Sequence, residues 1–184
     1  MDLTGKSLFI ANRGEIAVRI NRAAKALGLS VIQGHSEADA DMLAVRIADS
    51  AVELGPPAAS KSYLDVARVV AAAKETGADA VHPGYGFLAE NARFAAAVED
   101  AGMIFVGPTA DTISRMGDKV AAREAAIAAN VPTSPGSDGR IAGVADGLKV
   151  AMAIGYPLMI KAAAGGGGRG IRLAENNDDL TKLI

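Results

Sequence analysis

A run of glycines near the end of the chain is the feature best suited to chemistry. It reads Gly165-Gly166-Gly167-Gly168-Arg169-Gly170, and Lys161 closes the short apolar stretch before it. Glycine permits close approach of the backbone, so the N–H groups of such a loop can lie along a polyphosphate, while Lys161 adds positive charge at its base. Taken alone, the loop fits a phosphate-binding flap and equally a surface turn that binds nothing, because glycine runs also occur in linkers.

Two other nucleotide-binding patterns fit this chain poorly. The glycine run has the form G-x-G-x-x-G, but the dinucleotide fingerprint requires a helix to open at the glycines, whereas residues 171–173 are typical of a strand. Residues 55–62 come close to a P-loop, but Ser60 stands where the second glycine should be, and two prolines lack the N–H groups that would wrap a phosphate. We assign neither pattern.

Polar residues also occupy two turns that follow expected strands, where open α/β sheets bind ligands. Residues 12–15 read Asn-Arg-Gly-Glu, and residues 82–87 read His-Pro-Gly-Tyr-Gly-Phe. His82 has no carboxylate at an obvious spacing, so we interpret it as a hydrogen-bonded structural residue rather than a catalyst. Glu90 is expected to open the following helix, where its charge suits the helix dipole.

Lys119 stands where another helix is expected to begin. Asp118 before it is a good N-cap residue, and a cation in the first turn gains nothing from the helix dipole. This mismatch is a weak sign that Lys119 serves an anionic ligand.

The elements that would position these residues alternate in type through the first hundred residues. Short apolar runs and helical patterns follow one another, which predicts βαβ units that build a parallel sheet. The expected strands are residues 8–11, 31–32, 51–54, 80–82 and 104–106, and the expected helices are residues 16–27, 41–48, 64–76 and 91–101. The predicted fold class is therefore α/β, an open parallel Rossmann-like sheet with helices on both faces.

Beyond residue 106 the pattern changes. Helices are expected over 109–116, 119–130 and 144–154, strands over 158–161 and 171–173, and a helix begins at 178 without a stop signal. We therefore predict an N-terminal domain over 1–108, a helical connector over 109–132 and an incomplete second domain over 133–184.

Composition excludes several classes of protein. The chain has 184 residues, 19 Lys and Arg against 21 Asp and Glu, and a formal net charge of −2, so it lacks the basic footprint of a nucleic-acid binder. No cysteine is present, which excludes disulfides, a thiolate nucleophile and cysteine-ligated zinc. No stretch approaches the roughly 18 apolar residues of a membrane span, so we expect a cytoplasmic protein with no membrane partner.

Seven motifs, read together in order, resemble those of the biotin carboxylase family. They lie at residues 10–17, 61–64, 82–88, 105–108, 116–119, 135–139 and 155–157, and each alone is modest. The resemblance implies an ATP-grasp enzyme in which a pre-ATP-grasp domain precedes a lid that closes on ATP. Such an enzyme uses MgATP and bicarbonate to carboxylate biotin on a carrier protein, the first half-reaction of an acyl-CoA carboxylase in processes such as fatty acid biosynthesis. It further implies a carboxyltransferase partner and a homodimer at full length.

The resemblance also implies roles for particular residues. Lys119 and Lys161 would contact the nucleotide, and the loop glycines would lie over its phosphates, namely Gly165, Gly166, Gly167 and Gly168, the last two closest. Ala163 and Ala164 depart from the Ser and Gly usual in the family, which should stiffen the lid. The family's Mg²⁺ ligands, bicarbonate-holding residues and biotin-facing arginine would lie beyond Ile184, so no catalytic residue or metal ligand is assigned here, and the chain alone is expected to be inactive.

Two other interpretations stay open. The chain could belong to another ATP-grasp ligase, or it could be a non-catalytic module that dimerises or docks a carrier. The motifs at residues 12–16 and 82–88 favour the carboxylase over another ligase. The final carboxyl acceptor depends on the carboxyltransferase and cannot be read from this sequence.

Overall fold

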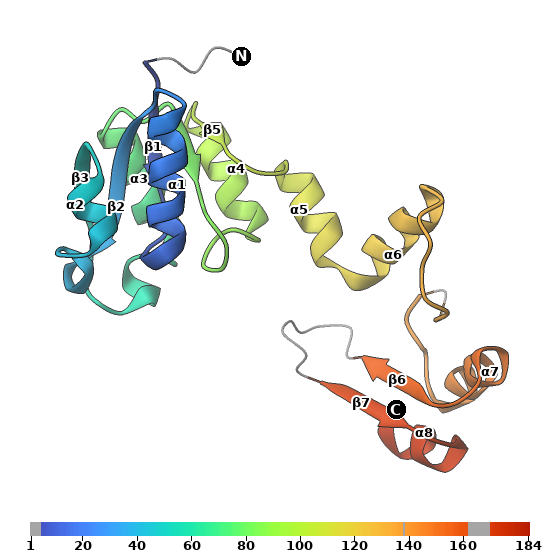
Figure 1. The fold of residues 1–184 in the computed structure, drawn as a ribbon. Helices are drawn as coiled ribbons and strands as arrows, with labels where there is room; N and C mark the ends of the chain where they lie inside the picture. The colour runs from blue at the N-terminus through green and yellow to red at the C-terminus, as the bar shows by residue number, and fades with distance from the viewer. Residues whose placement is uncertain (1–4, 138, 162–169) are drawn as a thin grey trace. The chain divides into compact units, whose positions relative to one another are not determined.

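The computed structural model describes residues 5–137, 139–161 and 170–184 (Figure 1). The chain forms two compact units, Met1–Ser114 and Arg115–Ile184. The domain limits predicted at residues 108 and 132 stay predictions, since the division into units reflects packing alone.

The first unit is built on a five-stranded parallel sheet, as the alternating pattern predicts. Its strands stand in the order β3-β2-β1-β4-β5, and all four neighbouring pairs are parallel. The strands are β1 (Ser7–Ile10), β2 (Ser30–Ser36), β3 (Ser50–Gly55), β4 (Ala80–His82) and β5 (Ile104–Phe105). This order reverses direction between β1 and β4, so the carboxyl ends of these two strands flank the point where open α/β sheets bind ligands.

Helices cover both faces of the sheet, as predicted. The helices are α1 (Gly14–Ala26), α2 (Leu43–Ile47), α3 (Val66–Glu75) and α4 (Ala92–Asp100). Alternate residues of β1 point to opposite faces: Leu8 and Ile10 pack in one buried cluster with α1 and α2, and Phe9 packs in another with α3 and α4. The period-two pattern of each strand thus divides the core into two layers.

Some expected boundaries are wrong, each for a local reason. Strand β2 runs to Ser36 rather than ending at residue 32, because its pairing with β3 continues to Ser36 without a run of apolar side chains. The helix expected over 41–48 begins only at Leu43, after the short 3₁₀ helix η1 (Glu37–Asp39); a second one, η2 (Ala59–Lys61), follows β3. Glu90 does not open α4, since Asn91 caps that helix by accepting the Phe94 N–H.

Two carboxylates hold the amino end of the sheet. Asp79 accepts the Ser7 N–H at 2.8 Å, and Asp49 accepts the Val31 N–H at 2.8 Å. The backbone hydrogen bond from Ser7 lowers the pKa of Asp79, and the side-chain hydrogen bond from Lys25 lowers the pKa of Asp49. These contacts satisfy N–H groups that the first residues of a parallel strand would otherwise leave without a partner.

The second unit packs helices against a two-stranded antiparallel sheet. Its elements are α6 (Lys119–Ala128), α7 (Val144–Ile154), β6 (Leu158–Lys161), β7 (Ile171–Ala174) and α8 (Asn177–Leu183), while α5 (Ala110–Gly117) spans the division between the units. Ala151, Ala174 and Leu180 form the core that joins α7, β7 and α8. The predicted bounds of α7 and β6 are confirmed. In the part of the chain that the structure describes, no helix has the length and apolarity to cross a bilayer.

Gly34 offers a test of the core beneath β2. A Cβ atom at this position would lie 2.8 Å from Cζ of Phe9 and 3.1 Å from Cδ1 of Leu54, both fully buried. We expect Gly34→Ala to lower the free energy of unfolding by about 1–3 kcal/mol, because a close-packed core cannot absorb an added methyl group without strain. Urea denaturation measures this change. Ser30→Ala, at the exposed start of the same strand, should be nearly neutral, and equal effects of the two variants would contradict the packing argument.

Candidate functional site

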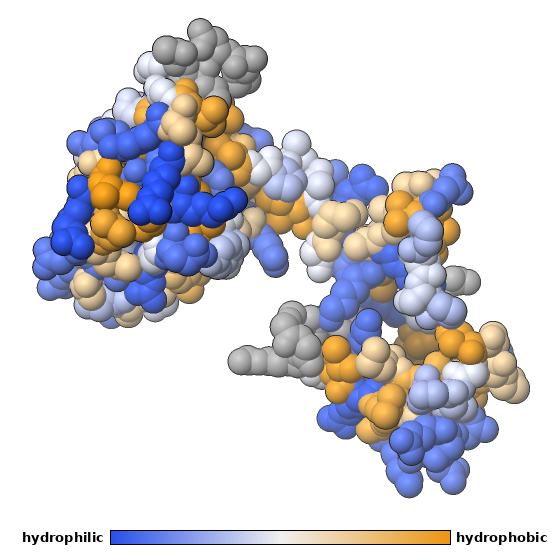
Figure 2. All heavy atoms as spheres, viewed as in Figure 1, coloured by the Kyte–Doolittle hydropathy of each residue, from blue (hydrophilic) through white to orange (hydrophobic). Residues whose placement is uncertain are grey.

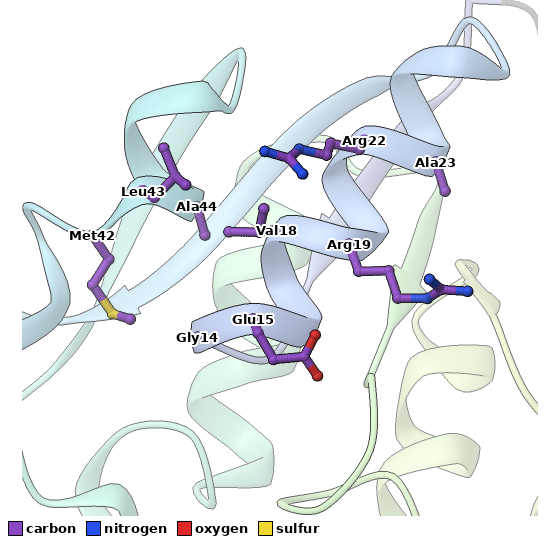
Figure 3. Close-up of a pocket in the computed structure, with 9 residues that line it drawn as sticks. All are labelled: Gly14, Glu15, Val18, Arg19, Arg22, Ala23, Met42, Leu43 and Ala44. Carbon is purple, nitrogen blue, oxygen red and sulfur yellow. The ribbon is translucent and has the colours of Figure 1, made fainter.

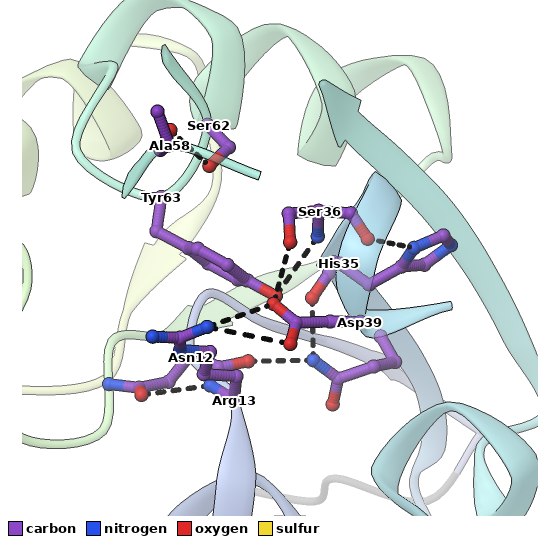
Figure 4. Close-up of polar contacts among 10 residues, drawn as sticks. Asn12, Arg13, His35, Ser36, Asp39, Ala58, Ser62 and Tyr63 are labelled. Carbon is purple, nitrogen blue, oxygen red and sulfur yellow. Dashed lines mark hydrogen bonds and ion pairs between the residues drawn. The ribbon is translucent and has the colours of Figure 1, made fainter. Parts of the chain in front are cut away.

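Three segments meet at the carboxyl edge of the first unit's sheet (Figure 4). The turn after β1 contributes Asn12 and Arg13, the end of β2 and η1 contribute Ser36 and Asp39, and Tyr63 comes from the segment after η2. Asn12, Ser36 and Tyr63 are buried, as is most of Asp39. The edge is therefore built around a polar interior rather than an apolar one.

The Asp39 carboxylate is the hub of this interior. Its Oδ2 accepts hydrogen bonds from the Ser36 hydroxyl at 2.6 Å and the Tyr63 hydroxyl at 2.7 Å, and lies 3.3 Å from Nη1 of Arg13. Burial acts to raise the pKa of Asp39, but the two hydroxyl donors and the Arg13 charge together hold the pKa below its usual value. Asp39 is therefore ionised at neutral pH. We call Arg13, Ser36, Asp39 and Tyr63 the Asp39 network.

Tyr63 connects the Asp39 network to the aromatic ring of Phe87. The Tyr63 hydroxyl also accepts the Ser36 N–H at 3.0 Å, and burial together with the hydrogen bond to Asp39 raises its pKa to about 12. The rings of Tyr63 and Phe87 stack with centroids 5.0 Å apart and an interplanar angle of 3°. The Arg13 guanidinium lies over both rings, 5.6 and 5.7 Å from their centroids. Its charge thus lies close to a carboxylate and to two aromatic rings at once.

Asn12 ties the turn after β1 to the turn after β4. Its Nδ2 donates to the carbonyl oxygens of Pro83 at 2.7 Å and Tyr85 at 2.8 Å. Gly84 lies between these two acceptors with φ at +68°, and a Cβ atom there would sit 2.7 Å from the same Nδ2. Glycine is required at this position by both conformation and space.

The outer part of the same turn presents Tyr85. Its side chain is 61% exposed, and its hydroxyl donates to Glu15 in the first turn of α1. This hydrogen bond raises the pKa of Tyr85. Tyr85 and Glu15 therefore form a polar, accessible pair above the buried network.

His82 is hydrogen bonded, as the sequence predicts. Its Nδ1 accepts the Gly84 N–H at 3.0 Å, and burial lowers its pKa. The neutral ring therefore fixes the first bend of the turn, and protonation of Nδ1 would remove the acceptor.

Lys161 closes β6 in the second unit, on the open face of its sheet. Leu158 and Ile160 point toward α7 and α8, while Met159 and Lys161 point to the other side and are exposed. The antiparallel register places Ile171 opposite Lys161 and Leu173 opposite Met159. Met159, Ile171 and Leu173 are 63%, 45% and 54% exposed, and Figure 2 shows apolar surface over these strands. We call Met159, Lys161, Ile171 and Leu173 the open face of β6 and β7.

The other predicted nucleotide contacts are placed only in part. Lys119 is the first residue of α6, and Asp118 caps that helix by accepting the N–H groups of Val120 and Ala121, which confirms the predicted cap. Gly165, Gly166, Gly167 and Gly168 lie outside the described residues. Their role and that of both lysines stay predictions.

A hollow of about 860 Å³ lies between α1 and α2 (Figure 3). Val18, Met42 and Leu43 give it an apolar lining, and Glu15, Arg19 and Arg22 stand along α1 beside it. These residue types suit a contact surface more than a catalytic centre, since the lining contains no histidine and no pair of carboxylates.

Metal ligands are not gathered in the described parts of the chain. No group of three or more His, Asp or Glu side chains in residues 5–137, 139–161 and 170–184 could hold a metal ion. No residue of this part of the chain is therefore assigned as a Mg²⁺ ligand.

Comparison with known proteins matches the two units to two sequence families. Residues 4–113 match the N-terminal domain of biotin carboxylase, and residues 118–184 match the ATP-binding domain of the carbamoyl-phosphate synthase L chain. Biotin carboxylase 1 of Bacillus subtilis is 55% identical over 179 residues, which is 97% of this chain and 40% of the relative. The chain thus spans about two fifths of the length of such relatives.

Solved structures agree with these matches. A biotin carboxylase complex with β,γ-ATP from Campylobacter jejuni has a TM-score of 0.90 and 46% identity, covering 97% of this chain and 40% of that one. The biotin carboxylase domain dimer of Hydrogenobacter thermophilus 2-oxoglutarate carboxylase, solved with MgADP, ADP and bicarbonate, has a TM-score of 0.87 and 45% identity, covering 96% and 39%. Both structures share the fold described above.

The lowered pKa of His82 predicts a pH effect on stability. The unfolded chain takes up a proton at this ring near pH 6.5 and the folded chain only at lower pH, so the stabilising contribution of neutral His82 is lost as pH falls below about 6.5. Because a single proton is involved, the free energy of unfolding can change by at most about 1.4 kcal/mol per pH unit. Partial exposure of the ring should keep this change well below that limit.

Urea denaturation between pH 7 and pH 5 measures this effect. In His82→Asn, the Asn Oδ1 can accept the Gly84 N–H without titrating. This variant should therefore make the free energy of unfolding less dependent on pH in this range. The lowered pKa values of Asp39, Asp49 and Asp79 affect stability below about pH 5, outside this range. An unchanged slope in the Asn variant would refute the role of His82.

Proposed function

Because this chain belongs to the biotin carboxylase family, we propose that it is the N-terminal part of an enzyme that uses ATP and bicarbonate to carboxylate biotin on a carrier protein. The observation that carries the proposal is the family match over residues 4–113, supported by 55% identity to a biotin carboxylase over 97% of the chain. The carrier protein and a carboxyltransferase would be its partners. The acceptor that the carboxyltransferase serves is left open.

The nucleotide would bind to the second unit. The open face of β6 and β7 sets apolar side chains beside Lys161, and a nucleotide has the matching division into an apolar base and anionic phosphates. The ATP-binding family match over residues 118–184 supports this assignment. Lys119 and the backbone of Gly165, Gly166, Gly167 and Gly168 would add further donors toward the phosphates.

The chemistry required of these groups is electrostatic. Transfer of a phosphoryl group from ATP to bicarbonate spreads negative charge over the phosphate oxygens, and fixed cations and N–H donors stabilise that charge. Mg²⁺, when bound, would neutralise part of it. Its ligands would come from residues outside the described part of this chain.

Bicarbonate-dependent ATP hydrolysis with biotin as acceptor tests the proposal on the complete enzyme. Stimulation by biotin, together with formation of carboxybiotin, is the expected result. ATP hydrolysis that needs a different acceptor would instead indicate another ATP-grasp ligase. Absence of nucleotide binding would favour a non-catalytic module. The 184-residue chain alone should show no turnover.

We also propose that the complete enzyme is a homodimer, and that the hollow between α1 and α2 contributes to the contact. Leu43 is 44% exposed beside Val18 and Met42. Figure 2 shows hydrophobic and strongly hydrophilic surface interleaved on the face that carries α1, which is the mixture common at protein contacts. The similar carboxylase domain from Hydrogenobacter thermophilus was solved as a dimer.

Lys161 provides the sharpest test of the nucleotide site. We expect Lys161→Ala in the complete enzyme to weaken ATP binding about tenfold, because it removes a charge-assisted hydrogen bond to a phosphate. Isothermal titration calorimetry with ATP measures this change. Lys149→Ala removes the same charge from the exposed side of α7 in the same unit and should leave the affinity unchanged. Equal affinities of the two variants would contradict the assignment.

A further inference from the structure

The loop of residues 82–88 holds one residue, Phe87, in a backbone conformation that its side chain does not favour. Gly84 and Gly86 have φ near +68°, and Phe87 has φ at +42° although it carries a bulky side chain. Aromatic residues rarely occupy this region, and such conformations persist only where the surrounding structure enforces them. The residues in contact with Phe87 must therefore hold it in this conformation.

Phe87 is held through its ring by the Asp39 network. The ring stacks face to face on Tyr63, which is 1% exposed and cannot move without losing its hydrogen bonds to Asp39 and Ser36. The Arg13 guanidinium lies over both rings while its Nη1 faces Asp39. The strained residue is thus fixed by a chain of contacts that ends at a buried charge.

Asn12 fixes the other half of the loop. Its Nδ2 holds the carbonyl oxygens of Pro83 and Tyr85, and its own carbonyl oxygen accepts from Nε2 of Gln33 at 2.7 Å. The loop is therefore attached at two points, to the turn after β1 through hydrogen bonds and to the segment after η2 through stacked rings. Tyr85 lies between these points and faces solvent.

This construction is costly if stability is its only purpose. A buried charge with several donors is often no more stabilising than apolar side chains of the same volume, although it selects one arrangement from many. The strained backbone of Phe87 supports the same conclusion, because strained conformations occur mainly at sites whose geometry matters for function.

We propose that Arg13, Asp39 and Tyr63 position the loop of residues 82–88, and with it Tyr85, for the reaction of the complete enzyme. They are positioning residues, since none of them needs to touch a reacting atom. The proposal rests on the proposed function, because it makes the carboxyl edge of the first sheet part of the reaction surface.

Hydrogen exchange on the 184-residue chain tests the positioning directly. Tyr63→Phe keeps the stacked ring and removes the hydroxyl, so exchange at the amides of residues 84–88 should rise at least tenfold while exchange in β4 stays unchanged. Tyr156→Phe, which removes a hydroxyl bonded to Asn177 in the second unit, is the matched control and should leave the loop unaffected. Unchanged loop exchange, or an equal rise throughout the first unit, would overturn the proposal.

Phe87 separates ring stacking from backbone strain. Phe87→Gly relieves the positive φ but removes the ring, whereas Phe87→Tyr keeps the ring. If the ring holds the loop, the Gly variant should exchange at least tenfold faster and the Tyr variant should match the unchanged chain. A Gly variant as protected as the unchanged chain would show that stacking does not hold the loop.

Kinetics of the complete enzyme then test the functional half. At a temperature where circular dichroism shows every variant folded, Tyr63→Phe and Phe87→Gly should lower kcat/KM for biotin carboxylation about tenfold, and Phe87→Tyr should restore it. Unchanged kinetics with a loosened loop would refute the positioning role. Failure of the unchanged enzyme to carboxylate biotin would instead refute the proposed function, and the exchange measurements would still decide what holds the loop.

Discussion

The carboxyl edge of the first unit depends on one buried negative charge. A carboxylate removed from water needs several donors, and Asp39 finds them on three segments that are distant in sequence: Arg13, Ser36 and Tyr63. Satisfying this single group fixes how the turn after β1, the end of β2 and the segment after η2 meet. At the opposite edge two partly exposed carboxylates, Asp49 and Asp79, accept strand N–H groups.

The sequence predicts most of the fold because residues that end helices and strands are clearly placed along it. Gly28, Gly77 and Gly102 follow α1, α3 and α4, and all three have φ between +69° and +83°, a conformation that suits glycine at a helix end. Strand β4 and helix α7 match their predicted bounds for a related reason, since clear apolar runs stand between turn residues. The prediction fails where a strand lacks apolar residues, as in β2 beyond Ile32, since pairing with a neighbouring strand, here mainly β3, has no signature in a local window.

The candidate site is less visible in the sequence than the fold. Lys161 can be placed at the end of a strand because β6 is short and apolar and glycines follow it. The buried position of Asp39 cannot be predicted in this way, because Asp39 lies between Glu37 and Asp41 in a stretch that resembles a solvated surface turn. Its partner Tyr63 is 24 residues away, and only the packing of η1 against the segment after η2 brings them together. Burial of polar groups over such separations is a property of the tertiary structure.

The two units meet the needs of binding in different ways. In the first, the Asp39 carboxylate finds its hydrogen-bond donors within the protein, so the carboxyl edge has a defined shape before any ligand arrives. In the second, the described residues form a two-stranded sheet, and α7 and α8 cover one face while Met159, Ile171 and Leu173 are exposed on the other. Two-stranded sheets gain most of their stability from what packs on them. Under the proposed function, a bound nucleotide would cover part of this open face.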